Sequence, residues 1–255
     1  AWTTTPWTLP SNMLLAVGPN VEYVAVQTYN QYTGKPMTVV LAKNLLSAYF
    51  SEKNVDLKLE DYKEGDKKIP FKVIDKTWLG KDLAGIQYEQ LFPWFKVTEE
   101  AHKVVTGDFV TTEDGTGIVH IAPTFGADDA KVGKENNVPG LTLIDKDGNL
   151  RPMVDMTGKF FKIEDIDPEF VKEYINVDLY KEYAGRYVKN EYDDTLGADD
   201  ATLDVDLSVA LKLENKAFRI ERYLHSYPHC WRTDKPVLYY PLDSWFIRTT
   251  AYKER

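Results

Sequence analysis

Gly115-Thr-Gly-Ile-Val-His-Ile-Ala-Pro-Thr-Phe-Gly-Ala-Asp-Asp129 is the stretch of this chain that most constrains its fold. Ile118–Ala122 predicts a buried strand, because it is a short apolar run closed by a proline. Gly126–Asn136 then predicts a helix with Asp128 and Asp129 in its first turn, where the helix dipole favours anions. The stretch therefore predicts a strand that leads directly into an acidic helix start, and loops at strand ends commonly carry sites.

His120 lies within the predicted strand. A lone histidine in such a strand can be a core residue whose hydrogen bonds are satisfied, and it can equally be part of a site. The acidic helix start nearby favours the interpretation that His120 is part of a site. Capping accounts for one of the two aspartates, whereas the other could face a pocket and bind an ammonium group.

The second informative stretch is Ala1-Trp-Thr-Thr-Thr-Pro-Trp-Thr-Leu-Pro-Ser-Asn12. Its prolines disfavour helix, so Thr3, Thr4, Thr5 and Thr8 belong either to a strand or to a rigid loop with exposed hydroxyls. Threonine hydroxyls can hold a water or a substrate oxygen without ionising. With a histidine and a carboxylate they could grip a small polar substrate, and no standard nucleophile accompanies them.

The composition is that of a globular protein. The 255 residues are 43% hydrophobic and 13% aromatic, enough for one large domain or a domain with an insertion. The net charge of −9 argues against autonomous binding to a nucleic-acid backbone, but allows a pocket for one nucleotide end. A single cysteine excludes an internal disulfide and suits a reducing compartment.

We expect no membrane partner, because no apolar run approaches membrane-spanning length and no secretory signal is present. The chain begins with Ala1 rather than Met, and its first motif starts at once. We therefore expect it to be a segment of a longer polypeptide.

The first part of the chain has mainly the pattern of strands. We expect strands at Met13–Val17, Val21–Gln27, Pro36–Leu41, Leu57–Glu60, Lys68–Trp78 and Lys103–Thr111, with a short helix at Ala42–Phe50.

The second part mixes helices with short strands. We expect a strand at Leu141–Asp145, a turn at Asp145–Asn149, a helix capped by Asp167 from Pro168 to Gly185, a solvated acidic loop at Glu191–Asp206, an amphipathic helix marked by Leu203, Leu207, Ala210 and Leu211, a strand at Ala217–Tyr223, and an extended end. The predicted architecture is a β-rich α+β domain with a barrel-like β core and peripheral helices.

Two other motifs do not carry the chemistry that they first suggest. Gly115-Thr-Gly117 is not a dinucleotide fingerprint, because His120 stands where the third glycine belongs; the two glycines more simply let the backbone turn closely past a pocket. His225-Ser-Tyr-Pro-His-Cys230 does not predict zinc, because its proline keeps the two histidines off one helical face and a second cysteine is missing. Cys230 lacks an obvious activating base, and no Gly-x-Ser-x-Gly elbow is present.

Trp2–Asn12 and Gly115–Asp129 together strongly resemble the editing domain of isoleucyl-tRNA synthetases. His225-Ser-Tyr-Pro-His-Cys-Trp-Arg232 and Asp243-Ser-Trp-Phe-Ile247 are similar to the segment in which that family's chain returns to its catalytic core. Valyl and leucyl relatives carry Thr-Arg-Pro-type peptides and lack a histidine at the position of His120, which favours the isoleucyl branch.

The resemblance implies a class I editing-domain fold over residues 1–224 and a return segment toward the missing catalytic core over 225–255. Within the first part, about 168–206 is a longer helical and acidic insertion than usual. The resemblance assigns no role to this insertion.

The activity implied is hydrolysis of the ester that joins valine to the isoleucine tRNA, with valyl-adenylate as a further candidate substrate. A synthetic pocket can discriminate one methylene by only ~1–3 kcal/mol, a general value for which this synthetase family is itself the standard illustration. A second site that admits valine and excludes isoleucine would supply the remaining selectivity. The alternative is a non-catalytic insertion that docks the tRNA acceptor end, which the acidic balance disfavours.

The resemblance also implies a role for each site residue. Asp129 holds the ammonium group, His120 limits the side-chain pocket, and Trp7 lies beside the terminal adenosine. The remaining residues bind the substrate, position the attacking water or line the same pocket: Thr3, Thr4, Thr5, Thr8, Gly117 and Phe125. Water attacks directly, and help from a ribose hydroxyl of the tRNA stays open.

The implied partners are the tRNA(Ile) 3′ end carrying valine and the rest of the synthetase chain, in the cytoplasm. No metal or cofactor is expected in this segment, because Thr233 stands where some members have the second cysteine of half a zinc site. ATP and magnesium would belong to the missing core, whose His-x-Gly-His and Lys-Met-Ser-Lys-Ser signatures are absent.

Overall fold

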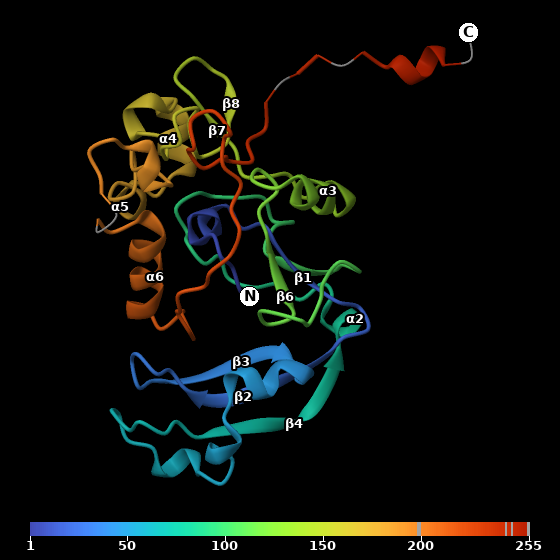
Figure 1. Cartoon of the computed structure of the whole chain (residues 1–255), viewed down its shortest axis with the longest axis vertical. Helices are drawn as coiled ribbons and strands as arrows, with labels where there is room; N and C mark the ends of the chain where they lie inside the picture. Colours follow the sequence, from blue (N-terminus) through green and yellow to red (C-terminus); the bar gives the residue numbers. More distant parts are fainter. Residues whose placement is uncertain (198–199, 243, 246, 254–255) are drawn as a thin grey trace.

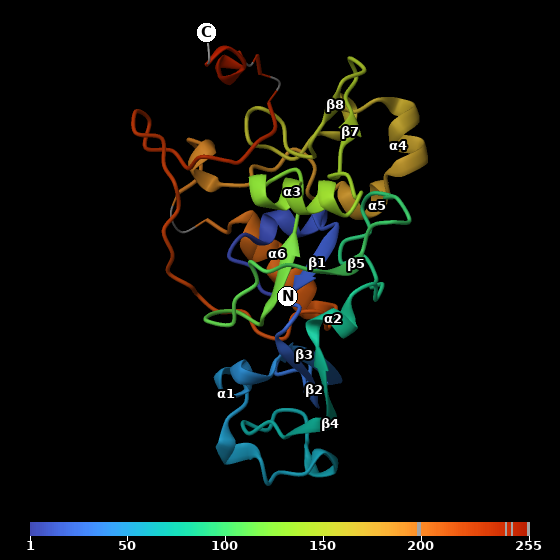
Figure 2. The same cartoon turned by 90° about the vertical axis from the view of Figure 1, so that its right-hand side faces the viewer.

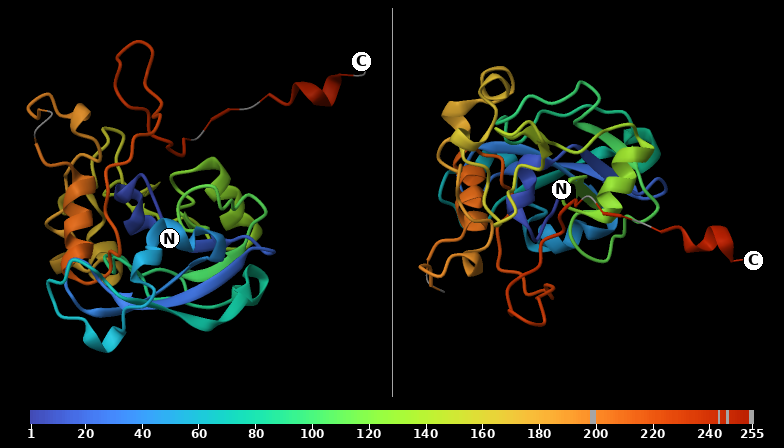
Figure 3. Two further views of the ribbon diagram at one scale, coloured as in Figure 1. Left: turned by 60° about the horizontal axis from the view of Figure 1, so that its bottom comes forward. Right: turned by 90° about the horizontal axis from the view of Figure 1, so that it is seen from above.

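The computed structural model describes residues 1–197, 200–242, 244–245 and 247–253. A three-stranded antiparallel sheet forms one end of the molecule, a second three-stranded sheet lies at its centre, and helices with a short hairpin form the other end (Figure 1). The C-terminal segment leaves this body and extends away from it (Figure 3).

The central sheet has the strand order β5-β1-β6. β1 (Leu14–Val17) pairs in parallel with β5 (Lys103–Thr106) and antiparallel with β6 (Ile118–Ile121). Val119 of β6 pairs with Ala16 of β1 and also forms an isolated parallel bridge with Trp2. Val119 therefore has Ala16 on one side and Trp2 on the other. At this position both edges of β6 are covered by the first seventeen residues of the chain.

The outer sheet has the order β3-β2-β4 and is antiparallel throughout. It consists of β2 (Glu22–Tyr29), β3 (Pro36–Ala42) and β4 (Phe71–Leu79), and the β2–β4 register shifts between Val24 and Val26. A second, smaller core cluster, which includes Phe50 and Phe71 and also Val17 of β1, packs against it.

Tyr23 connects the two sheets. Its side chain is fully buried, its hydroxyl donates to the Gly117 carbonyl at 2.6 Å, and the same oxygen accepts from the Gly18 amide at 2.9 Å. Gly117 has φ +71°, and a Cβ at this position would lie 2.6 Å from the Ala42 Cβ. Glycine is therefore required here by both conformation and space.

The helices are short. They are α1 (Leu46–Tyr49), α2 (Gly80–Leu83), α3 (Ala127–Glu135), α4 (Pro168–Tyr174), α5 (Val177–Tyr180) and α6 (Leu203–Leu213). The 3-10 turns are η1 (Pro6–Ser11), η2 (Lys43–Leu45), η3 (Glu52–Asn54), η4 (Leu59–Asp61), η5 (Ile163–Asp165), η6 (Asn190–Tyr192) and η7 (Thr249–Tyr252). α3 lies at the end of β6, as the sequence predicts (Figure 2).

The main core fills the space between the central sheet and the helical end. Phe160 and Tyr180 are fully buried there, and Trp94 stacks on Tyr183 with ring centroids 4.6 Å apart. The α6 residues that carried the predicted apolar stripe, Leu203, Leu207 and Leu211, are buried against the same core.

The hairpin of β7 (Leu143–Ile144) and β8 (Leu150–Arg151) closes around one carboxylate. Asp145 Oδ1 accepts from the Asn149 amide at 2.8 Å and the Asp147 amide at 3.0 Å, and Oδ2 accepts from Arg151 Nε at 2.9 Å. These donors, led by the Asn149 amide, lower the pKa of Asp145 to about 2. The predicted turn at Asp145–Asn149 is confirmed.

Several sequence predictions are wrong. The fold is mixed α+β, but no barrel-like core closes within the described residues, whose strands form open sheets of three, three and two strands. Leu57–Glu60 is not a strand; it is exposed chain that enters η4. The helix capped by Asp167 begins at Pro168 as predicted but ends at Tyr174. Beyond Tyr174 the chain pairs with residues 94–96 around an isolated bridge between Phe95 and Ile175. There the Lys96 amide donates to the Tyr174 carbonyl, and the Asn176 amide donates to the Trp94 carbonyl.

Ala217–Tyr223 is also not a strand. Side chains of the β2–β3 loop bind its carbonyls instead of a ladder partner: Asn30 Nδ2 donates to Ala217 at 2.9 Å and Gln31 Nε2 to Phe218 at 3.1 Å. β5 is shorter than predicted and ends at Thr106. None of the helices in the part of the chain described is long and apolar enough to cross a membrane.

Candidate functional site

The threonines lie in a turn rather than in a strand. Pro6 opens η1, Thr5 N donates to Thr3 Oγ1 at 3.0 Å, and the two hydroxyls are 3.3 Å apart. Thr8 is buried, and its hydroxyl donates to the Thr5 carbonyl at 2.9 Å. Thr4 lies half-buried in the same turn. The loop interpretation is therefore correct, although its hydroxyls are less exposed than expected.

His120 connects this turn to the second motif. Its Nε2 lies 3.0 Å from Thr8 Oγ1, and its Nδ1 lies 2.8 Å from Asn12 Nδ2. Burial lowers the pKa of His120 to about 4. The ring is consequently neutral near pH 7, and both of its nitrogens are engaged.

Asn12 and Tyr88 are two residues that the sequence analysis missed. Asn12 is buried; its Nδ2 also donates to the Leu14 carbonyl at 2.9 Å, and its Oδ1 accepts from the Tyr88 hydroxyl at 2.6 Å. His102 Nε2 lies 3.1 Å from the Asn12 carbonyl. Asn12 ends the quoted threonine motif, so its position was a usable signal, whereas nothing near Tyr88 in the sequence indicated its contact.

Asp129 and Asp128 differ in their surroundings as the sequence suggested. Asp128 is exposed, whereas Asp129 is half-buried and its Oδ2 accepts from the Ala122 amide at 2.8 Å. Burial raises the pKa of Asp129, opposed by the Ala122 amide, and the charge of Asp128 raises it further. A carboxylate disfavoured in this way would be stabilised by a bound cation.

Trp7 and Phe125 pack together at the same place. Their rings meet edge to face with centroids 5.0 Å apart, and both side chains are buried. Within the described chain, Trp7 Nε1 and Thr124 Oγ1 are buried without a hydrogen-bond partner. Gly117, in contrast, packs against Tyr23 and Ala42 of the outer sheet.

Asp204 of α6 holds the threonine turn from outside. Its Oδ1 accepts from the Trp7 amide at 2.7 Å, and its Oδ2 lies 3.4 Å from Lys189 Nζ. Burial raises the pKa of Asp204, and the charge of Lys189 opposes that rise. The prediction of a solvated loop at Glu191–Asp206 is therefore wrong for Asp204, because the last residues of that stretch begin α6. Ala198 and Asp199 of the same stretch lie outside the described residues.

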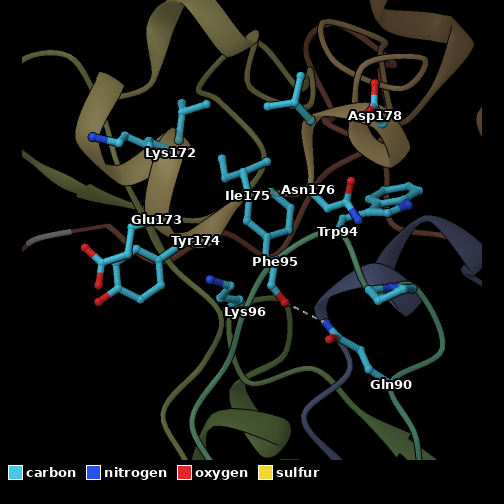
Figure 4. A pocket seen from close by; sticks show the side chains of 13 residues that line it. Gln90, Trp94, Phe95, Lys96, Lys172, Glu173, Tyr174, Ile175, Asn176 and Asp178 are labelled. Atoms are coloured by element: carbon cyan, nitrogen blue, oxygen red, sulfur yellow. Dashed lines mark hydrogen bonds between the residues drawn. The ribbon is translucent and has the colours of Figure 1, made fainter.

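Two surface cavities lie in the described part of the chain, and no predicted site residue lines either of them. A surface cavity of about 690 Å³ is bounded by residues 90–96 and 171–178, and none of the predicted site residues lines it (Figure 4). A smaller one of about 380 Å³ includes Tyr88 and His102, which both contact Asn12.

The C-terminal motifs do not gather metal ligands. In the described part of the chain, no group of three or more His, Cys, Asp or Glu could hold a metal ion. Cys230 lies in a turn in which the Thr233 hydroxyl and backbone amides lower the pKa of its thiol. Asp243 and Phe246 of the return motif lie outside the described residues, and their neighbour Trp245 is fully exposed.

Comparison with known proteins aligns the whole of this chain with a segment of isoleucine–tRNA ligases. Over 255 residues the chain is 64% identical to the isoleucine–tRNA ligase of Bacteroides fragilis and 61% identical to that of Porphyromonas gingivalis. It is 58% identical, over 276 aligned residues, to that of Bacteroides thetaiotaomicron. Each alignment covers all of this chain but only 22–24% of the relative, so the chain spans about a fifth to a quarter of their length.

No family model matches the chain. Among solved structures, "The crystal structure of GlLeuRS-CP1" aligns with a TM-score of 0.44 at 14% identity, covering 86% of this chain and 83% of that one.

Proposed function

Because the whole chain matches one segment of isoleucine–tRNA ligases, we propose that it is the editing domain of such an enzyme and removes valine from mischarged tRNA(Ile). Valine differs from isoleucine by one methylene, which a single binding pocket discriminates weakly. A hydrolytic site that admits only the smaller side chain would supply the missing selectivity.

The observation that carries the proposal is the chain of contacts from Thr5 through Thr8 to His120. It joins two motifs that are 112 residues apart in sequence. The arrangement supplies hydroxyls and a neutral imidazole, but no activated nucleophile. Such a set suits direct attack by water on an ester better than a covalent route.

In the proposed reaction, water adds to the ester carbonyl carbon, and the bond from that carbon to the ribose oxygen breaks. The ribose oxygen takes a proton, so the products are valine and uncharged tRNA. Thr3, Thr4 and Thr5 hold the water and the substrate oxygens, and a neighbouring ribose hydroxyl could assist from the substrate itself.

Asp129 would bind the ammonium group of valine. The Ala122 amide engages Oδ2, and Oδ1 accepts no hydrogen bond from the described residues. A bound ammonium would offset the burial that disfavours this carboxylate. His120 would limit the pocket in size, Phe125 would line the same pocket, and Trp7 would lie beside the terminal adenosine.

The tRNA would be delivered by the rest of the enzyme, because a chain of net charge −9 offers little for backbone binding. Valyl-adenylate is a second candidate substrate with the same ammonium group. ATP and magnesium would act in the remainder of the enzyme, which we expect to work in the cytoplasm.

Deacylation of valyl-tRNA(Ile) and isoleucyl-tRNA(Ile) by this chain and by the full-length enzyme tests the proposal. We expect loss of valine only, abolished by Asp129→Ala. Asp128→Ala is the matched control, because it removes an exposed aspartate from the same helix turn and should leave the rate unchanged. A full-length enzyme that leaves valyl-tRNA intact would favour a docking role instead.

A further inference from the structure

The polar groups around His120 form one continuous series. It runs from the Tyr88 hydroxyl to Asn12, from Asn12 to His120 Nδ1, from His120 Nε2 to Thr8, and from Thr8 to the Thr5 carbonyl. Every contact in the series is 2.6–3.0 Å long, so each needs one donor and one acceptor.

The Leu14 carbonyl sets the direction of the series. A carbonyl oxygen only accepts, so the Asn12 atom 2.9 Å from it must be the amide nitrogen. Turning the amide over would place two acceptors in contact. The Asn12 oxygen then accepts from Tyr88, and the second amide hydrogen is directed at His120 Nδ1.

We propose that Asn12 fixes His120 as the neutral tautomer protonated on Nε2, and that His120 donates to Thr8 to position the threonine turn instead of acting as a base. Nδ1 must accept from Asn12, so a neutral ring carries its proton on Nε2. Nε2–H donates to Thr8, and the Thr8 hydroxyl donates to the Thr5 carbonyl.

In this arrangement neither ring nitrogen has a free lone pair with which to take a proton from water. Protonating Nδ1 would set its N–H against the amide hydrogens of Asn12, which agrees with the low pKa of His120. Asn12 is accordingly a positioning residue, because it acts on the turn only through His120. Its role in deacylation rests on the proposed function, whereas the tautomer does not.

The ¹⁵N NMR signals of the His120 ring test the tautomer directly. The chain has four histidines, and His120→Gln assigns the signals of this one. We expect an unprotonated-type shift for Nδ1 and a protonated-type shift for Nε2 at neutral pH. The reverse pattern, an averaged pattern or a cationic ring would overturn the proposal. This measurement is made with Asn12 and Thr8 unchanged.

Asn12→Asp tests what fixes the tautomer. A carboxylate can only accept from Nδ1, so we expect the proton to move there and the two ¹⁵N patterns to exchange. Asn30→Asp is the matched control: Asn30 is also fully buried and donates to a backbone carbonyl, that of Ala217, yet contacts no part of the series. A folded Asn12→Asp variant in which Nδ1 stays unprotonated would contradict the role of Asn12.

Steady-state deacylation by the full-length enzyme tests the consequence for the reaction. Thr8→Val removes the acceptor of Nε2–H, and we expect kcat to fall on the order of 10- to 100-fold with little change in KM. Glutamine at position 120 can donate to Thr8 and accept from Asn12 but cannot serve as a base, so we expect His120→Gln to lose no more of kcat than Thr8→Val does. A loss that exceeds that of Thr8→Val by about 10²–10⁴-fold would identify His120 as a base and overturn the proposal.

The two proposals fail in different ways. If the enzyme does not remove valine but the ring is protonated on Nε2, the proposed function fails and the tautomer stands. If valine is removed but Nδ1 carries the proton, the function stands and the positioning role fails.

Discussion

His120 makes the stability of the protein depend on pH. Its pKa is about 4 in the folded chain, mainly through burial, against an ordinary value of about 6.5. As pH falls from about 6.5 to about 4, the unfolded chain binds a proton that the folded chain does not. Stability is therefore lost across that window, and denaturant unfolding should show a shallower loss in His120→Gln. An unchanged pH slope would contradict the buried neutral ring.

His120→Ala should also change which substrate is hydrolysed. Removing the imidazole deletes bulk and both hydrogen bonds, so the pocket enlarges. We expect isoleucyl-tRNA(Ile) to be deacylated at a rate that approaches the residual rate for valyl-tRNA(Ile). Parallel assays with the two esters measure this ratio, and continued rejection of isoleucine would show that another residue sets the size limit.

The ionised Asp129 carboxylate should lower the stability of the folded protein, although it would bind the ammonium group of the substrate. Burial raises its pKa, so between the ordinary value and the raised one the folded chain binds more protons than the unfolded chain. Stability from this group therefore falls as pH rises through that window and stays lower above it. Asp129→Asn, which can still accept from Ala122, should unfold at an equal or higher temperature at pH 7 while losing deacylation.

At the level of residues, the sequence predicted local features of its two motifs, such as a threonine loop rather than a helix. Helix position predicted that the two aspartates of the first turn would differ, and the structure shows that Asp129 is half-buried and Asp128 exposed. Tyr88 and Asp204 could not be predicted, because their contacts with Asn12 and Trp7 join segments 76 and 197 residues apart. Only the folded chain brings such groups together.

At the level of elements, α6 and η1 act as a pair. Asp204→Ala removes the acceptor of the Trp7 amide and leaves that buried donor without a partner. We expect the free energy of unfolding to fall by about 1–3 kcal/mol and the deacylation rate to fall with it. Asp204→Asn keeps an acceptor oxygen, so it should retain most of the stability; equal losses in both variants would point to the Lys189 pair instead.

Element predictions succeeded where local patterning decides the structure. The leucine spacing predicted α6, and Asp167 with Pro168 predicted the start of α4. They failed where distant partners decide it: α4 ends at Tyr174 because residues 94–96 bind its carboxyl end, and Ala217–Tyr223 binds side chains in place of a strand.

At the level of the whole molecule, the Tyr23 hydroxyl is a buried polar link between the two sheets. Tyr23→Phe would leave the buried Gly18 amide and the Gly117 carbonyl unpaired. We expect a loss of about 1–3 kcal/mol in the free energy of unfolding, measured in urea, with β-sheet content retained. Tyr29→Phe, whose hydroxyl only donates to Leu59 near the surface, is the control and should cost less.

The arrangement of sheets was beyond what the sequence could predict. Alternating strands such as β2, β3 and β4 indicated sheet correctly, but strand spacing does not reveal which strands share a sheet. The parallel pairing of β1 with β5 joins residues about ninety positions apart. The strands form open sheets in place of the predicted barrel-like core.

The placement of β6 between Trp2 and β1 also has a kinetic consequence. At Val119 both edges of β6 are covered, and both covering segments belong to the first seventeen residues. The β6 amides that are bonded to them exchange with solvent only when one of these segments separates. Opening that separates β6 from β1 must therefore disturb the threonine turn between them. Deuterium should enter the β6 amides and the Thr5 and Thr8 amides at one common rate, so the turn would open and close together with the strand it borders.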